Sequence, residues 1–206
     1  MCISANEICG HFSPLVEDET VLKKGDVAKI DFGVHFDGFA AMLAHTIVVG
    51  EDQVTGKKAD VILAAWNALQ AAVRTIKAGS YNHQITTNTE KVCEAYGVNA
   101  VEGVLSHELH KMLLDGNNVI LNKETADHRV SEVEFQVNQI YAIDVFVSSG
   151  AGKPKEADLK TTVFKRALDA NYDLKTKNAR AFLSQVLKSN PCFGFSLRAF
   201  EDEIVI

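Results

Sequence analysis

Two aspartates inside strand-like apolar runs are the residues best placed to do chemistry. Asp31 and Asp144 each follow an isoleucine in such a run, 113 residues apart. Burying an ionised carboxylate costs several kcal/mol unless it is paired, hydrogen-bonded or bound to a metal ion. The repeated pattern therefore predicts one polar site built from two similar halves. Its carboxylates either bind a divalent metal ion or accept structural hydrogen bonds, and the residues alone leave both readings open.

The first aspartate belongs to a predicted β-hairpin. Two apolar runs flank Asp37-Gly38, a dipeptide that supplies the positive φ angles of a two-residue turn. Such a turn pairs residue 36 with residue 39, so Asp31 faces Ala44 and Met42 is its diagonal neighbour. We therefore expect the Met42 side chain to point into the site.

The elements that position these residues alternate between helix and strand. Before Gly79, apolar side chains at helical spacing predict a helix with a buried stripe of Ile62, Trp66, Leu69, Val73 and Ile76. Short apolar runs bounded by turn residues predict the strands. We expect helices at 58–78, 83–96 and 177–188, a mobile loop at 116–131, and strands at 27–35, 39–49, 99–107, 133–137, 139–148, 161–165 and 195–200.

The composition is that of a globular protein. With 206 residues and 47% hydrophobic content, the chain can bury a substantial core within one domain, 1–206. No stretch approaches the roughly 20 apolar residues that cross a bilayer, and no N-terminal segment resembles a signal peptide. The four cysteines show neither metal-type spacing nor a disulfide framework. We therefore expect free thiols in a reducing intracellular compartment, and no membrane partner.

Charge is unevenly distributed along the chain. Residues 151–200 hold ten basic and four acidic side chains, a net +6, whereas the whole chain carries −6 and the remainder therefore −12. A local basic surface can bind nucleic-acid phosphates even on an acidic protein, although a solvated charged face is the simpler reading. The candidate RNA-binding residues are Lys153, Lys155, Lys160, Lys165, Arg166, Lys175, Lys177 and Arg180.

Longer motifs around these positions carry a family resemblance. They are His11-Phe12-Ser13-Pro14-Leu15, Lys29-Ile30-Asp31-Phe32-Gly33, Asp37-Gly38-Phe39, Ala44-His45-Thr46, Leu105-Ser106-His107, Tyr141-Ala142-Ile143-Asp144 and Val147-Ser148-Ser149-Gly150. The chain resembles the methionine aminopeptidases and, within them, the non-peptidase branch of proliferation-associated, ErbB-receptor-binding proteins. The resemblance implies the α+β pita-bread fold, two pseudo-twofold halves around an antiparallel sheet. It also implies a fragment that is truncated at both ends.

The resemblance further implies a reduced metal site. Asp31 matches the first bridging aspartate of the family, His107 its histidine ligand, and Asp144 a glutamate ligand shortened by one methylene. Met42 stands where the second bridging aspartate is expected. A thioether is a poor ligand for the hard divalent ions that carboxylates bridge.

Two further family positions concern the substrate cleft and the last ligand. His11 matches a substrate-positioning histidine, and Asp115 replaces the second one. The last glutamate ligand has no counterpart before the chain stops at 201–206. Because a two-metal hydrolase needs both ions clamped about 4 Å apart, we expect no bound metal, no cofactor and no catalysis.

Recognition is then the function that the resemblance implies. We expect RNA, ribosomes and protein partners, with roles in translation, ribosomal-RNA processing and transcription in the cytoplasm, nucleus and nucleolus. No small-molecule substrate is expected. Two alternatives remain: a peptide- or histone-binding module that uses the vacated cleft, and a residual metal-dependent aminopeptidase.

Overall fold

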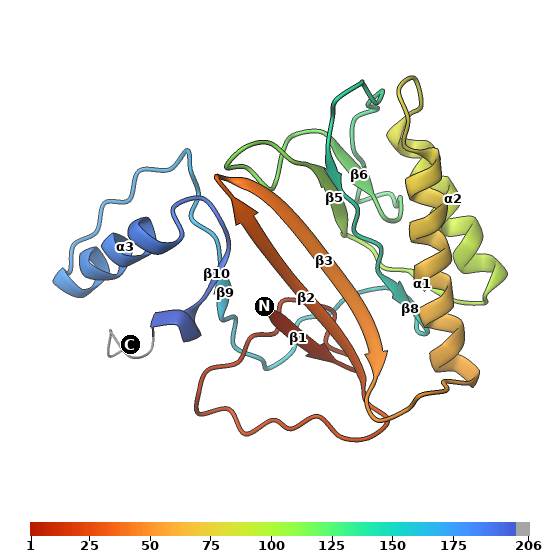
Figure 1. The fold of residues 1–206 in the computed structure, drawn as a ribbon, viewed down its shortest axis with the longest axis horizontal. Coiled ribbons are helices and arrows are strands. Elements are labelled where there is room, and N and C mark those ends of the chain that lie inside the picture. The colour runs from red at the N-terminus through yellow and green to blue at the C-terminus, as the bar shows by residue number, and fades with distance from the viewer. Residues whose placement is uncertain (201–206) are drawn as a thin grey trace.

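A long β-hairpin crosses the middle of the protein, whose computed structural model describes residues 1–200 (Figure 1). Asp31 lies opposite Ala44, so the expected register is confirmed. The turn uses positive φ angles, 50° at Asp37 and 84° at Gly38, which a two-residue loop of this kind requires. A third strand pairs with the other edge of the first hairpin strand. The antiparallel sheet has the order β1 (Cys2–Ala5), β2 (Val27–Phe36), β3 (Phe39–Val48).

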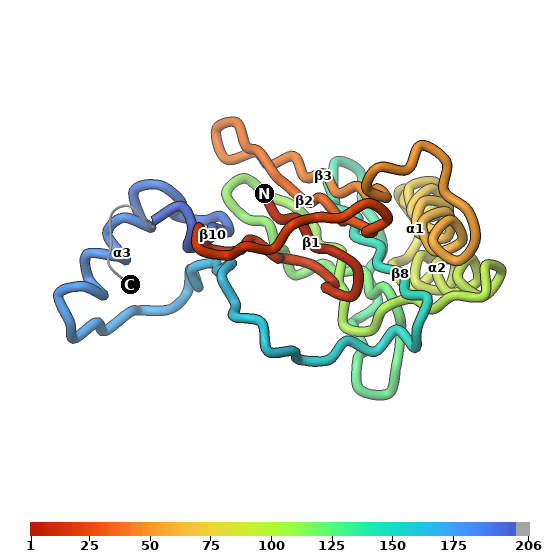
Figure 2. The backbone as a smooth tube through the Cα atoms, turned by 90° about the horizontal axis from the view of Figure 1, so that it is seen from below, coloured from red at the N-terminus to blue at the C-terminus, as the bar shows by residue number. Residues whose placement is uncertain are grey.

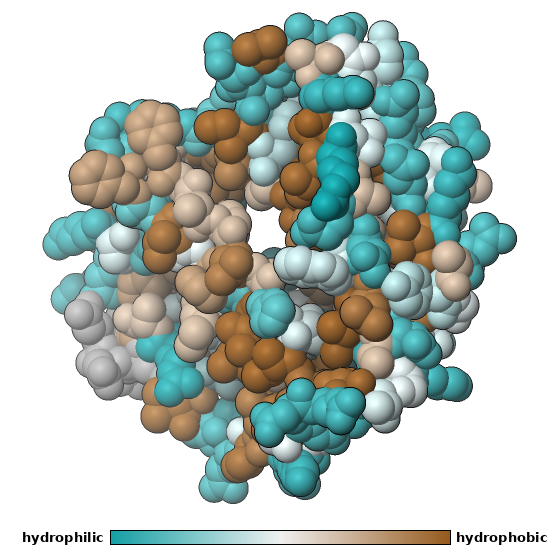
Figure 3. Space-filling view, turned by 45° about the vertical axis from the view of Figure 1, so that its right-hand side comes forward, coloured by the Kyte–Doolittle hydropathy of each residue, from teal (hydrophilic) through white to brown (hydrophobic). Residues whose placement is uncertain are grey.

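One face of this hairpin is apolar and exposed. Successive side chains of a strand point to opposite faces, so the even-numbered residues of β2 and the odd-numbered residues of β3 share the face turned away from Asp31. Brown, hydrophobic side chains gather around the middle of the molecule in Figure 3. The large exposed residues on the outer hairpin face are Phe32, Val34, Phe36, Phe39, Leu43 and Ile47.

Two long helices pack against each other at one end of the protein (Figure 1). They are α1 (Gly56–Thr75) and α2 (Asn82–Ala95), and their bounds lie within three residues of the expected ones. The buried face of α1 consists of Ala64, Ala68 and Ala72, which are fully buried at intervals of four residues. Among the described residues, 1–200, no helix combines the length and apolar character that crossing a bilayer requires.

The expected apolar stripe of α1 is wrong at Trp66 and Val73. Trp66 is 53% exposed and Val73 is 56% exposed, whereas Ile62, Leu69 and Ile76 are half-buried. The distance between packed elements depends on the side chains at the contact. Alanine side chains allow α2 and the short strands to approach α1 closely, and this leaves the bulkier side chains on an adjacent face.

Short strands lie between the hairpin and the helices (Figure 1). Two expected strands are each broken. The run 99–107 is interrupted near Gly103, whose φ of 77° leaves the extended region. The run 139–148 is interrupted around Asp144, whose N–H donates to Ser106 Oγ at 2.9 Å instead of joining a ladder. The strands are β4 (Asn99–Ala100), which pairs with β8 (Val147–Ser148), and β5 (Leu105–Glu108), which lies between β6 (Val119–Leu121) and β7 (Tyr141–Ala142).

Two more expectations change in the same region. Residues 116–131, expected to be a mobile loop, contain β6, and Ile120 and Leu121 in this strand are buried. An apolar run of three residues is too short to show a strand period. Residues 133–137 form no strand, and only a single bridge joins Glu134 to Tyr81.

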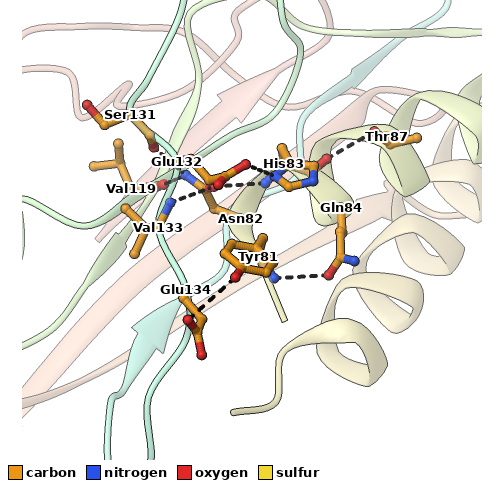
Figure 4. Close-up of polar contacts among 10 residues, drawn as sticks. All are labelled: Tyr81, Asn82, His83, Gln84, Thr87, Val119, Ser131, Glu132, Val133 and Glu134. Carbon is orange, nitrogen blue, oxygen red and sulfur yellow. Dashed lines mark hydrogen bonds and ion pairs between the residues drawn. The ribbon is translucent and has the colours of Figure 1, made fainter. Parts of the chain in front are cut away.

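A buried asparagine ties the start of α2 to these segments (Figure 4). Asn82 is 2% exposed, and its Nδ2 donates to Val119 O and Ser131 O, each at 2.9 Å. Its Oδ1 accepts the N–H of His83 at 2.9 Å and that of Val133 at 3.1 Å. An amide side chain offers two donor hydrogens and two acceptor lone pairs, so all four are used.

The third helix lies at the opposite end of the protein from α1 and α2, as Figures 1 and 2 show. Helix α3 (Lys177–Ser189) agrees with the expected 177–188, and the Thr176 hydroxyl caps it by accepting the N–H of Ala179 at 3.2 Å. The rings of Phe182, Phe195 and Phe200 pack edge to face, with centroids 5.4 to 6.1 Å apart.

The chain reaches this end of the protein along an extended path. After β8 it runs beneath the hairpin in the view of Figure 2 and then enters a short two-stranded sheet. The expected strands 161–165 and 195–200 are therefore reduced to two residues each. They are β9 (Val163–Phe164) and β10 (Phe195–Ser196), the latter followed by the 3-10 helix η1 (Leu197–Phe200).

Candidate functional site

The site face of the hairpin carries Asp31, Gly33 and His35 at alternate positions of β2. Met42 lies opposite Gly33, on the same face as Asp31. A Cβ atom placed on Gly33 would be 2.6 Å from Met42 Sδ, so the methionine side chain lies across the glycine. The position expected to supply a second bridging carboxylate instead places a thioether next to Asp31.

Asp144 enters the site from the irregular segment between β7 and β8. Burial and, to a lesser extent, the negative charge of Asp31 raise the pKa of this carboxyl to about 6, and His11 opposes the shift. The structure therefore brings Asp31, Asp144 and His11 into electrostatic contact. His11 itself has a left-handed φ of 58°, a conformation that non-glycine residues rarely adopt.

His107 and Asp115 form a second group of candidate site residues. His107 lies on β5 between β6 and β7, with its Nδ1 3.5 Å from Gly116 O. Asp115 accepts a hydrogen bond from the Lys165 ammonium, which lowers the pKa of the carboxyl; partial burial opposes this, and the charges of Lys165 and His107 lower it further. Sequence reasoning missed the contact between Lys165 and Asp115, because nothing in the two segments indicates that they meet.

The C-terminal part of the described chain lies against this side of the hairpin. The rings of His35 and Phe193 have centroids 4.5 Å apart. Thr162 Oγ1 donates to Ser13 O at 2.6 Å, and Ser13 Oγ donates to Ser196 Oγ at 2.9 Å. Residues far along the chain thus complete the surroundings of the site.

The donor atoms do not fit a dinuclear metal centre. Within residues 1–200, no three His, Cys, Asp or Glu side chains converge in a way that could hold a metal ion. Hard divalent ions prefer carboxylate and carbonyl oxygens, and the Met42 thioether offers neither charge nor oxygen. The segment 201–206, where the expectation of a missing last glutamate falls, lies outside the described residues.

The candidate RNA-binding residues are spread along the molecule. Lys153 follows Gly152 near β4, whereas Lys175 and Lys177 lie at the start of α3, at the other end of Figure 1. Lys165 and Arg166 are half-buried, and the other six are exposed. Three of the arginine and lysine heads bind the chain itself. Lys165 pairs with Asp115, Arg166 Nε donates to Pro191 O at 3.1 Å, and Arg180 Nη1 donates to Leu174 O and Lys175 O, each at 3.0 Å. The segment that connects β8 to β9, called the connecting segment below, carries three of the exposed residues, Lys153, Lys155 and Lys160.

Comparison with known proteins defines the family. The model of metallopeptidase family M24 matches residues 1–168, so the chain belongs to this family. It is 45% identical over 203 residues to ERBB-3 binding protein 1 of Solanum tuberosum, covering 98% of this chain and 52% of that protein. It is 43% identical over 206 residues to proliferation-associated protein A of Dictyostelium discoideum, and this match covers 98% of this chain and 54% of that protein. These matches confirm the resemblance to the proliferation-associated, ErbB-receptor-binding branch.

A further curated relative and two solved structures extend the comparison. The curved DNA-binding protein of Schizosaccharomyces pombe is 42% identical over 204 residues, covering 95% of this chain and 53% of that protein. The chain thus spans about half the length of these curated relatives. A thermophilic Arx1 superposes with a TM-score of 0.88 at 26% identity, and the match covers 98% of this chain and 61% of that chain. A methionine aminopeptidase from Thermotoga maritima superposes with a TM-score of 0.64 at 26% identity, and the match covers 73% of this chain and 57% of that chain. The expected pita-bread fold is confirmed.

Proposed function

We propose that this chain is a non-catalytic member of family M24 that acts by binding RNA and proteins. The observation that carries the proposal is Met42, which lies across Gly33 beside Asp31 in place of a bridging carboxylate. A hydrolase with two metal ions needs anionic oxygens between the ions to hold them and to activate water. A site with a thioether at this position lacks that clamp, and the cleft remains as a surface for recognition.

The names of two relatives support nucleic acid and protein as the kinds of partner. The name of one relative states DNA binding and that of another states binding to ERBB-3. The basic segment 151–200 supplies the charge that phosphate recognition requires. The resemblance to the proliferation-associated branch adds the setting that we propose, which is ribosome-associated control of translation, ribosomal-RNA processing and transcription, in the cytoplasm and in the nucleus including the nucleolus.

A restored aspartate tests the non-catalytic assignment and its alternative, a residual aminopeptidase. The experiment measures metal content by elemental analysis and methionine release from a short peptide, for the parent and for Met42→Asp. We expect neither protein to bind a pair of manganese, cobalt or zinc ions or to release methionine. The variant adds a carboxylate beside Asp31 and Asp144 but does not restore the substrate histidine that Asp115 replaces. Methionine release by the parent would refute the assignment.

Charge removal in the connecting segment tests RNA binding. The exposed residues Lys153, Lys155 and Lys160 are replaced together by alanine, and affinity for a structured RNA is measured at several salt concentrations. For each lysine that binds a phosphate, the substitution should reduce the log–log salt slope by roughly 0.7 to 0.9. The matched control replaces three exposed lysines elsewhere, Lys23, Lys24 and Lys57. If both triple variants lose affinity equally, only net charge matters and the assignment of the segment is wrong.

A second function is favoured by one contact in the cleft. The Lys165 ammonium sits on Asp115, close enough to His107 for the histidine to affect the pKa of that carboxyl. The cleft therefore already accepts a cationic group, and Asp31 and Asp144 add further carboxylates. A basic peptide or histone tail is the ligand that this chemistry fits, and titration of a fluorescent lysine-rich peptide tests it. Absence of saturable binding by both the parent and Lys165→Ala would exclude this function.

A further inference from the structure

A polar cavity lies where α1 ends and α2 begins, and none of the cleft residues lines it. Its volume is about 440 Å³, within the range of pockets that hold small ligands. Arg74 and Lys77 line it from the end of α1 and the following turn. His83, Thr87 and Lys91 line it from α2, where a spacing of four residues places them on one face.

The lining of this cavity is basic. Arg74, Lys77, Lys91 and His83 contribute to it, and no acidic side chain does. Within residues 1–200, the arginine and the two lysines form no ion pair, whereas His83 Nδ1 lies 3.3 Å from a carboxylate oxygen of Glu132 (Figure 4). Like charges around one cavity repel one another unless an anion offsets them.

Helix stability explains only part of this arrangement. A cation near a helix C-terminus is favourable, which accounts for Arg74 in the last turn of α1. His83 lies at the start of α2, where the helix dipole favours negative charge, and the first turn of α2 contains no acidic residue. The dipole of α2 would favour an anion in the cavity, whereas the C-terminal end of α1 would oppose it, so the attraction rests on the three cations.

Hydrogen bonds hold the walls of the cavity in place. Ser80 Oγ lies 2.7 Å from both Thr75 O and Lys77 O and accepts the Lys77 N–H at 3.2 Å, which fixes the turn after α1. Asn88 Nδ2 donates to Thr75 Oγ1 at 3.0 Å, which joins the end of α1 to α2. A ligand would therefore enter a largely preformed site and lose little affinity to the ordering of its walls.

We propose that this cavity binds a small, free phosphorylated ligand whose phosphate contacts Arg74, Lys77 and Lys91. A guanidinium presents a planar pair of donors that matches phosphate oxygens, and an ammonium adds a compact charge. No aliphatic side chain lines the cavity, so its chemistry favours a hydrophilic ligand such as a sugar or polyol phosphate. The proposal does not depend on the RNA-binding function.

Titration calorimetry with inorganic pyrophosphate tests the proposal. We expect saturable binding to the parent and a loss of about tenfold or more in affinity for Lys77→Ala combined with Lys91→Ala. The control combines Lys24→Ala with Lys57→Ala, two exposed lysines whose removal changes the net charge equally. Since Lys57 and Arg74 are about 25 Å apart along α1, this control should leave the affinity within about twofold.

Amide NMR shifts supply a measurement that needs no variant. Pyrophosphate should shift Thr87 and Asn88, which line the cavity, and should leave the α3 amides unchanged. Absence of saturable binding at about millimolar pyrophosphate overturns the proposal, as does an equal loss in the two double variants. If the Lys77 and Lys91 variant loses its binding of structured RNA but keeps its binding of pyrophosphate, these lysines belong to an RNA-binding surface and the proposal is wrong.

Discussion

Lys165 donates to the carboxylate of Asp115, and this contact joins the residue that follows β9 to the segment between β5 and β6. The two residues are 50 positions apart. The side chain of Lys165 is 28% exposed and that of Asp115 is 49% exposed, so water and salt screen the pair. The contact therefore contributes little to the stability of the fold, but it gives the carboxylate beside His107 a cationic partner.

The first prediction is that breaking this pair changes recognition more than stability. A double-mutant cycle with Lys165→Ala and Asp115→Ala, followed by urea unfolding, should give a coupling below about 1 kcal/mol. Lys165→Ala should nevertheless strengthen the binding of a lysine-rich peptide, because Asp115 loses its internal partner. Lys160→Ala removes the same charge from an exposed position. An equal gain in peptide affinity for Lys160→Ala would mean that net charge alone controls peptide binding.

The second prediction concerns the dependence of stability on pH. Burial, with a further contribution from Asp31, raises the pKa of Asp144 from its ordinary value of 3.8 to about 6 in the folded protein. Between these values the folded state binds the proton and the unfolded chain does not. This group therefore favours folding fully below about pH 4, and its contribution is lost as pH rises to about 6.

Asp144→Asn isolates that contribution. The shift corresponds to about 2 to 3 kcal/mol, so the variant should be more stable than the parent near pH 7 and should lose most of this advantage near pH 4. Urea unfolding of both proteins across this pH range measures the difference, in which the other titrating groups cancel. A difference that does not vary with pH would mean that the Asp144 carboxyl titrates normally.

The third prediction is that Asn82 is a major stabilising residue. Asn82→Ala leaves the carbonyls of Val119 and Ser131 and the N–H groups of His83 and Val133 without their partner. Each buried group left unsatisfied costs about 1 to 3 kcal/mol, less where water enters. We expect a loss of about 3 kcal/mol or more in the free energy of unfolding.

A surface asparagine provides the comparison for that loss. Asn117 is exposed, so Asn117→Ala should change the free energy of unfolding by no more than about 0.5 kcal/mol. Asn82→Asp is expected to destabilise as well, because a carboxylate cannot donate to the two carbonyls. Wild-type stability of Asn82→Ala would show that water replaces the asparagine without cost.

The fourth prediction is that the outer face of the hairpin causes association. Phe36 is 88% exposed and Phe39 is 59% exposed, and the two pair across the tip. A contiguous exposed apolar surface favours self-association. Phe36→Ser combined with Phe39→Ser should reduce the concentration-dependent increase in mass measured by sedimentation, with little change in stability. Val21→Ser, at a site 72% exposed outside this face, should leave association unchanged.

Features determined by local sequence were predictable, and features determined by distant contacts were not. The Asp37-Gly38 turn determines the hairpin register, and from that register alone Met42 shares a face with Asp31. Helical periodicity gives the bounds of α1, but it does not decide whether the alanines or the larger residues form its buried face. The break at Asp144 depends on the Ser106 hydroxyl, 38 residues away. The pattern of apolar residues along the sequence does not indicate a contact between residues so far apart.

The contacts of Ser13 set an order of events during synthesis. Its carbonyl accepts from Thr162 and its hydroxyl donates to Ser196, which follow it by 149 and 183 residues. At roughly 5 to 20 residues per second, the ribosome needs on the order of ten seconds to make the intervening chain. The hairpin can form early, but the ring contact of His35 with Phe193 must wait that long. A nascent chain therefore presents His35 to chaperones and other binding proteins before Phe193 is in place.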